Sequence, residues 1–243
     1  MFFPYKDDNP TELAPTVTIG IIALNVLVWV VFQGAGAAHS LAASTCEWGL
    51  VPGEVLRRLP AGVSVPLGQG FECVTTGTPN YLTIFTSMFL HGSWFHILGN
   101  MWFLWIFGNN IEDAMGHGRY AVFYLLSGVA AAGAQAFSNP HSAVPMIGAS
   151  GAISGVMGAY LVLFPKVRVH TLVFLGIFFT TIAVPAYLML VYWFLIQLLG
   201  GLPALGGSAD SGGVAFFAHV GGFVAGLVLV KAFLRGDFRS AGA

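Results

Sequence analysis

Long apolar runs alternate with short polar or glycine-rich breaks along most of the chain. A helix needs about 20 mostly apolar residues to cross a bilayer, and several runs approach that length. Ser93, a good N-terminal cap, marks the start of the second run. The pattern predicts six membrane-spanning helices, at residues 16–34, 94–114, 118–137, 144–164, 182–200 and 214–234.

Three stretches between these spans are unusual. Residues 35–92 form a long first loop, which is rich in glycine and proline up to residue 80. Residues 169–200 are apolar throughout, which is too long for one span and too short for two. We therefore expect residues 169–181, rich in β-branched and aromatic side chains, to be an interfacial or re-entrant approach to the fifth span. A glycine- and serine-rich loop at 201–213 precedes the sixth.

Composition supports a membrane protein. Only 8% of the 243 residues are charged and 56% are hydrophobic, whereas about a quarter of the residues in soluble domains are charged. Nine Lys and Arg against ten Asp and Glu leave no basic surface for nucleic acid. The prediction is an all-α polytopic membrane protein with one domain at 16–234, an N-terminal tail at 1–15 and a C-terminal tail at 235–243.

The distribution of basic residues predicts the orientation. Most of them fall on the side of the two termini, which the positive-inside rule assigns to the cytoplasm: Lys6, Arg119, Lys166, Arg168, Lys231, Arg235 and Arg239. Acidic residues before the first span argue against a signal peptide and a mitochondrial transit peptide. We therefore expect a multi-pass protein of the cell membrane with both termini cytoplasmic. Cys46 and Cys73 share the first loop, and the sequence allows either a disulfide between them or two free thiols.

The spans contain few polar side chains, and those few lie at similar depths. With a rise of about 1.5 Å per residue, Asn100, Ser150 and His219 fall roughly 8–10 Å below the outer ends of the second, fourth and sixth spans. His96 shares a helix face with Asn100, four residues away. Ionisable groups within a membrane are costly and commonly functional. We expect these side chains to form one site.

Small residues on two of these spans predict close packing. His219, Gly222 and Gly226 lie along one stripe of the sixth span. The fourth span has two pairs of small residues spaced four apart: Gly151 with Gly155, and Ser154 with Gly158. Such pairs let helix backbones approach closely in a membrane. This arrangement would allow a hydrogen bond between Ser150 and His219.

The residue types favour nucleophilic catalysis. A serine hydroxyl becomes a good nucleophile when a base accepts its proton, and His219 is a suitable base. No carboxylate lies at this depth, so we expect a dyad. Asn100, His96 and the backbone N–H of Ser150 are candidate donors to an oxyanion. We interpret Ser154, Trp193 and Gln197 as packing residues.

Other chemistries find less support. A zinc site would need a His-Glu-x-x-His run or a carboxylate beside the histidines, and the sequence has neither within the spans. His91 and His96 are five residues apart and would face different directions on a helix. An aspartate-pair protease would need membrane aspartates. We predict no metal and no cofactor.

The same residues resemble the motifs of the rhomboid family of intramembrane serine proteases. Gly148-Ala149-Ser150-Gly151 is similar to the family's G-x-S-G motif, and the segment from His91 through His96 to Asn100 is similar to its H-x₄-H-x₃-N element. Ala218-His219-x-x-Gly222-x-x-x-Gly226 resembles the motif of its last core helix. The residues at 80–82 depart from the family, many members of which have a Trp or Trp-Arg pair there.

The resemblance implies a prokaryotic-type six-helix bundle whose long first loop lies partly in the membrane interface. It implies a serine endopeptidase that cleaves transmembrane or juxtamembrane segments of other proteins, with its active site open to the outer side. It further implies that the fifth helix and the 201–213 loop act as gate and cap. The implied roles are nucleophile for Ser150, general base for His219, oxyanion donors for His96, Asn100 and Ser150, and support for His91, Gly148, Gly151, Gly222 and Gly226.

Two other functions remain open. A rhomboid-like protein without protease activity could bind membrane clients, although such proteins usually lack the serine or the histidine. A transporter could use the histidines as a proton relay, but no membrane carboxylate or repeat of spans supports it.

Overall fold

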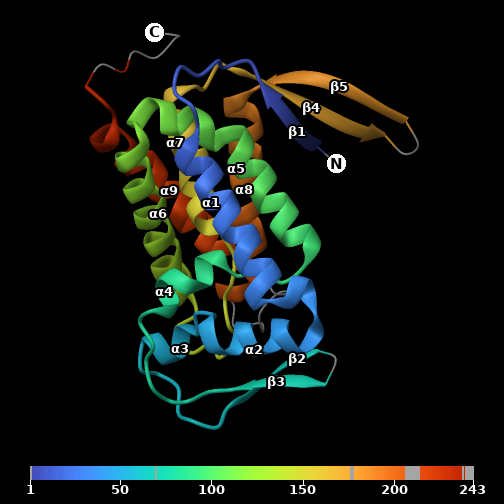
Figure 1. Ribbon diagram of the computed structural model, residues 1–243, viewed down its shortest axis with the longest axis vertical. Coiled ribbons are helices and arrows are strands. Elements are labelled where there is room, and N and C mark those ends of the chain that lie inside the picture. The colour runs from blue at the N-terminus through green and yellow to red at the C-terminus, as the bar shows by residue number, and fades with distance from the viewer. Residues whose placement is uncertain (1, 69, 176–177, 206–213, 237, 239–243) are drawn as a thin grey trace.

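A bundle of long helices forms the body of the protein (Figure 1). The computed structural model describes all residues except 1, 69, 176–177, 206–213, 237 and 239–243. In this part of the chain the bundle consists of α1 (Thr16–Leu27), α5 (Trp94–Met115), α6 (His117–Ser138), α7 (Ser150–Leu163), α8 (Ala186–Leu205) and α9 (Phe216–Phe233). Every residue from 151 to 160 of α7 is buried, so α7 is the central helix.

Smaller elements cover both ends of the bundle (Figure 1). The loop end carries η2 (Gly34–Gly36), α2 (Ala38–Trp48), α3 (Pro52–Val55), β2 (Ser64–Gly68), β3 (Phe71–Val74), α4 (Thr83–Thr86) and η3 (Ser87–Phe89), and η1 (Val28–Phe32) leads to it from α1. The opposite end, called the terminal end because the described chain starts there with β1, carries an antiparallel sheet in the order β1-β4-β5. Its strands are β1 (Phe2–Asp7), β4 (Arg168–Leu175) and β5 (Phe178–Pro185).

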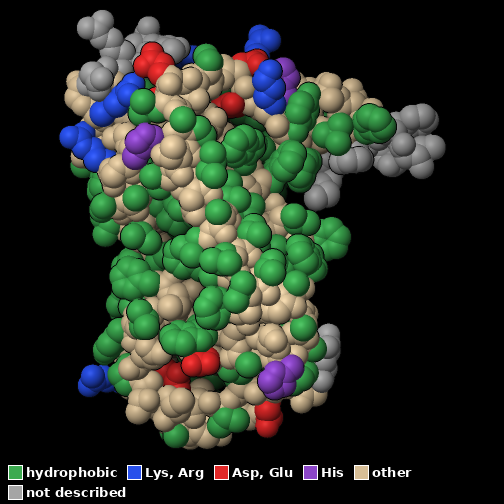
Figure 2. All heavy atoms as spheres, in the orientation of Figure 1, with side chains coloured by type: hydrophobic (Ala, Val, Ile, Leu, Met, Phe, Trp, Pro, Cys, Tyr) green, Lys and Arg blue, Asp and Glu red, His purple; other side chains and the backbone are tan. Residues whose placement is uncertain are grey.

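Among the described residues, three helices are long and apolar enough to cross a membrane: His117–Ser138, Ala186–Pro203 and Phe216–Phe233. Two shorter apolar helical segments, Thr16–Phe32 and Ser150–Leu163, lie beside them. Figure 2 shows hydrophobic side chains over much of the middle of the visible face, with charged side chains gathered toward its two ends. This distribution suits a protein whose middle is surrounded by lipid. The count of six spans remains a prediction.

Several predicted boundaries agree with the structure. The second predicted span is α5, and the Ser93 hydroxyl caps it by accepting a hydrogen bond of 3.1 Å from the backbone N–H of His96. The third is α6. In the first loop Cys46 and Cys73 form a disulfide, which ties α2 to β3 and settles the choice that the sequence left open.

The predicted start of the fourth span at residue 144 is wrong. The helix begins at Ser150, because residues 144–149 follow an irregular path with Pro145 and with Gly148 at a positive φ of 132°. Met146 instead exchanges two backbone hydrogen bonds with Leu50 of the first loop, of 2.7 and 3.0 Å. Ser150 therefore occupies the first turn of its helix, and the depth calculated from residue 144 does not apply.

The prediction for residues 169–200 is wrong in its boundaries. Residues 182–185 belong to β5, and α8 continues to Leu205, past the predicted end of the span at 200. The hairpin of β4 and β5 projects sideways from the terminal end (Figure 1), so it is not a re-entrant segment. Its β-branched and aromatic residues favour a strand. Residues 206–213 of the predicted cap loop, and most of the predicted C-terminal tail, lie outside the described residues.

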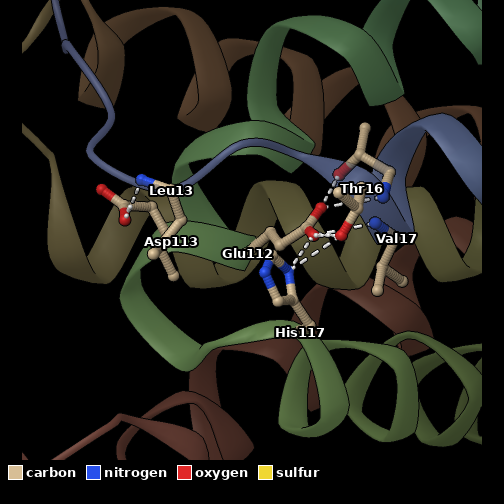
Figure 3. A network of polar contacts seen from close by, with 7 residues as sticks. Leu13, Thr16, Val17, Glu112, Asp113 and His117 are labelled. Carbon is tan, nitrogen blue, oxygen red and sulfur yellow. Dashed lines mark hydrogen bonds and ion pairs between the residues drawn. The ribbon is translucent and has the colours of Figure 1, made fainter.

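A buried carboxylate anchors the start of α1 to the end of α5 (Figure 3). Glu112, fully buried, accepts hydrogen bonds of 2.8 Å from the backbone N–H groups of Val17 and Thr18. It also accepts from the Thr18 hydroxyl at 2.7 Å and lies 2.6 Å from Nδ1 of His117. The first N–H groups of a helix lack partners within it and carry partial positive charge. Glu112 therefore fixes α1 against the bundle.

The predicted N-terminal tail is partly folded, because β1 pairs with β4 and inserts a carboxylate between helices. Asp7 accepts hydrogen bonds from the Tyr160 hydroxyl at 2.5 Å and from the Asn110 amide at 2.8 Å. Burial raises the pKa of Asp7, and the two hydrogen bonds oppose this shift only in part. The ionised form is therefore disfavoured in the folded protein relative to the unfolded chain.

We expect Asp7→Asn to raise the melting temperature in detergent at neutral pH by about 2–4 °C, the shift that roughly 1 kcal/mol produces in a protein of this size. A carboxyl with a raised pKa stabilises the fold most at low pH and less as the pH rises through its folded pKa. The gain should therefore shrink on acidification. The control is Asp8→Asn, because Asp8 is next to Asp7 in the sequence and is exposed. A lower melting temperature for Asp7→Asn at neutral pH would contradict this account.

Candidate active site

The site lies near the loop end of the bundle, where α7 and α9 begin. Oγ of Ser150 and Nε2 of His219 are 2.8 Å apart, within hydrogen-bond distance. Ser150 is the first residue of α7, and His219 is in the first turn of α9. Both residues are half-buried, so the pair is reachable from outside the protein core.

The other ring nitrogen of His219 determines its protonation state. Nδ1 lies 2.8 Å from Oε1 of Gln197 on α8. An amide oxygen only accepts hydrogen bonds, so with this orientation of Gln197 the neutral ring pairs with it when Nδ1 carries the proton and Nε2 has a free lone pair. The Ser150 hydroxyl is then the donor to Nε2. This is the arrangement in which histidine can withdraw the proton of a serine nucleophile.

Glycines bring the two helices into backbone contact. A Cβ atom at Gly222 would collide with the carbonyl oxygen of Gly151, and one at Gly226 would collide with that of Gly155. A Cβ atom at Gly158 would collide with the carbonyl oxygen of Phe223 in the same way. The predicted close packing of these helices is confirmed, and it holds the serine and the histidine at bonding distance.

The ring of His96 lies close to Gly148, as the Ser150 hydroxyl does. The backbone N–H of Gly92 donates to Nδ1 of His96 at 3.2 Å, so the neutral ring carries its proton on Nε2. A Cβ atom at Gly148 would lie 2.9 Å from this Nε2 and 3.5 Å from Oγ of Ser150. Both atoms therefore border one small space, which only a glycine at this position leaves free.

Asn100 and His91 complete the predicted set. Asn100 is one turn below His96 on α5, is only 8% exposed, and its amide Nδ2 has no hydrogen-bond partner among the described residues. An unsatisfied buried donor is costly, so this amide nitrogen is a candidate donor to a ligand. His91 is fully buried, with its ring centroid 5.1 Å from that of His96 and its backbone held by Gln33. His91 thus packs behind His96.

A cavity of about 330 Å³ lies at the loop end; His96 is in its wall, whereas Ser150, Asn100 and His219 are not. Its wall includes His96, the first loop and the irregular segment before α7: Gly36, Leu41, Gly92, Val144, Met146 and Ala215. The cavity is large enough to admit water or several side chains of a peptide.

The structure agrees with the interpretation of Ser154 as a packing residue but not with that of Gln197. The Ser154 hydroxyl is buried and donates to the backbone carbonyl of Ser150 at 2.6 Å, as a packing residue would. Gln197 is not merely a packing residue, because it bonds the ring of His219. The sequence did hold a signal for this role, because Gln197 is the single amide side chain in an otherwise apolar helix. Within the described residues no group of three or more His, Cys, Asp or Glu side chains could hold a metal.

Comparison with known proteins gives a consistent result. Residues 78–236 match the family model described as Rhomboid domain. The chain is 32% identical over 152 residues to RHOMBOID-like protein 1 of Arabidopsis thaliana, covering 62% of this chain and 34% of that protein. It is 30% identical over 190 residues to Rhomboid-like protease 5 of Toxoplasma gondii, covering 74% and 20%.

A bacterial relative, Rhomboid protease GluP of Bacillus subtilis, is 27% identical over 162 residues, covering 64% of this chain and 27% of that protein. The matched regions thus span about a third or less of these relatives' own lengths. The family match itself covers more than half of this chain. The chain therefore belongs to the rhomboid family, and with its apolar helices it is a multi-pass membrane protein.

Proposed function

We propose that this protein is an intramembrane serine endopeptidase that cleaves membrane-protein segments with a Ser150–His219 dyad. The observation that carries the proposal is the 2.8 Å contact between Oγ of Ser150 and Nε2 of His219. The names of relatives, which include two proteases, support the same activity.

The proposed reaction begins with attack of the Ser150 oxygen on the scissile carbonyl carbon. His219 takes the hydroxyl proton on Nε2, and the carbonyl oxygen becomes an oxyanion. When the C–N bond breaks, His219 gives that proton to the leaving amine. Water, activated in turn by His219, then hydrolyses the acyl-enzyme and restores the serine.

Preorganised donors would stabilise the oxyanion. Nε2–H of His96 borders the space beside Ser150, and the unpartnered amide of Asn100 lies one turn below it. The backbone N–H of Ser150 is a third candidate, because it is the first N–H of α7 and has no partner within the helix. Such donors are aimed at charge that develops only during the reaction.

We further propose six spans, cytoplasmic termini and a site open to the outer side of the cell membrane. The disulfide in the first loop supports this orientation, since disulfides persist outside the reducing cytoplasm. A substrate helix hides its carbonyls in its own hydrogen bonds. Good substrates should therefore contain helix-weakening residues near the cut, and the family resemblance adds a small residue before it.

Asn100→Ala should lower turnover by roughly 10²-fold, the order found for loss of one oxyanion donor. Expression and melting temperature should change little, because the amide nitrogen has no partner to lose among the described residues. Cleavage rates in detergent measure the effect. Leu98→Ala, on the exposed face of the same helix, is the control. Unchanged turnover in Asn100→Ala would remove this residue from the oxyanion hole.

The proposed activity can be tested in proteoliposomes with a panel of single-span substrate proteins. We expect fragments cut within or next to the span, identified by mass spectrometry, and none with Ser150→Ala. Substrate binding without cleavage by the native protein would favour the client-binding alternative. Solute flux across the same vesicles that survives both Ser150→Ala and His219→Ala, without proteolysis, would favour a transporter.

A further inference from the structure

Helix α8 makes a polar contact with His219, the proposed base. Most of its side chains are exposed on the surface of the bundle, among them Leu195, Ile196 and Leu199. Gln197 is different: it is 9% exposed, and its side-chain oxygen lies 2.8 Å from Nδ1 of His219. An amide buried in an apolar helix is expensive unless it is bonded. The His219 contact satisfies its oxygen.

The direction of this hydrogen bond affects the chemistry. With the amide oxygen toward the ring, Nδ1 carries the proton and Nε2 faces Ser150 as an acceptor. If the amide nitrogen faced the ring instead, it would donate to Nδ1, and Nε2 would carry the proton. That tautomer could not accept a proton from Ser150. The two tautomers thus differ in whether His219 can act as a base.

A second side chain of α8 limits the movement of the same ring. Trp193 is one turn before Gln197, on the same helix face. Its ring centroid lies 5.8 Å from that of His219, with the planes tilted by 40°. Trp193 also packs on Phe223 of α9, at 6.1 Å. One side chain therefore bonds the edge of the imidazole, and the other packs close to the ring.

We propose that Gln197 is a positioning residue that selects the Nδ1-protonated tautomer of His219, while Trp193 restricts the orientation of the ring. This inference rests on the proposed function, since it assigns His219 the role of base. It also makes the base depend on the position of α8: a displacement of this helix away from α9 removes both contacts.

Direct measurement of the tautomer tests the proposal without requiring activity. Nitrogen-15 NMR of histidine-labelled protein, with His219→Asn to assign the signal, distinguishes protonated Nδ1 from protonated Nε2. We expect the native protein to hold the proton of His219 on Nδ1, and Gln197→Leu to lose this preference. An unchanged tautomer in Gln197→Leu overturns the proposal.

Kinetics then distinguish positioning from a structural role. Gln197→Leu should lower kcat by about 10- to 100-fold with KM within about twofold, part of the 10²–10⁴-fold that a general base supplies. Gln197→Glu retains an acceptor but adds a charge that stabilises the protonated ring. It should keep most of kcat at high pH and move the acid limb of the kcat profile to higher pH. An acid limb in Gln197→Glu that stays at the native pH overturns the positioning role.

Gln135→Leu is the matched control, because the oxygen of Gln135 accepts from the backbone N–H of Ala218, next to His219, and not from the ring. It should leave the pH profile and the tautomer unchanged. Absence of cleavage by the native protein would reject the proposed function, yet the NMR result would still decide whether Gln197 sets the tautomer. The two failures are thus distinguishable.

Discussion

His219→Ala should reduce turnover by about 10⁴- to 10⁶-fold, the range found when a serine hydrolase loses its base. In the proposed mechanism the ring of His219, 2.8 Å from Oγ, is the proton acceptor for Ser150, and that hydroxyl has no other hydrogen-bond partner among the described residues. Cleavage rates in proteoliposomes measure the loss. The loss of turnover should be large and the fall in melting temperature small, because the glycine contacts between α7 and α9 remain.

His141→Ala is the control for this substitution, because His141 is exposed at the loop end and makes no contact with Ser150 in the described structure. Its turnover should match that of the native protein. Retention of a tenth or more of the native rate by His219→Ala would exclude His219 as the general base.

Gly222→Val should abolish activity and destabilise the protein. Its Cβ would collide with the carbonyl oxygen of Gly151, a backbone atom that cannot move aside without shifting a helix. Overpacking of this kind commonly costs about 1–3 kcal/mol. The separation of α7 and α9 should also break the Ser150–His219 hydrogen bond. Turnover and melting temperature in detergent measure both effects.

Two further variants separate local strain from loss of the fold. Gly222→Ala adds a single carbon and should also lose activity, with a smaller drop in melting temperature. Gly133→Val, on α6, adds the same side chain as Gly222→Val at a place where a Cβ meets nothing within 4 Å. It should keep its activity. Equal activity of Gly222→Val and Gly133→Val would contradict the close-packing account.

Local signals predicted the elements whose boundaries depend on nearby residues. Ser93 caps α5 because its hydroxyl serves an N–H three residues away, and this is visible in the sequence. The small-residue stripe of α9 likewise predicted its contact with α7, since both sides of that contact have glycines. The pairing of Ser150 with His219 followed from the same stripe.

Long-range pairings account for what the sequence did not predict. The start of α7 depends on Met146 pairing with Leu50, nearly a hundred residues earlier. The strand in the N-terminal segment forms only because β4 supplies its partner more than 160 residues later. Gln197 was interpreted as packing because the contact with His219 depends on how α8 and α9 are rotated. Periodicity alone carries no such information.

The central claim, that the Ser150 hydroxyl is the activated nucleophile, can be tested most directly by covalent labelling. The native protein is treated with a fluorophosphonate, which reacts with activated serines, and the modified residue is located by mass spectrometry. We predict an adduct on Ser150 that disappears in Ser150→Ala and persists in Ser154→Ala. Labelling that survives Ser150→Ala, or an adduct on another residue only, would contradict the account.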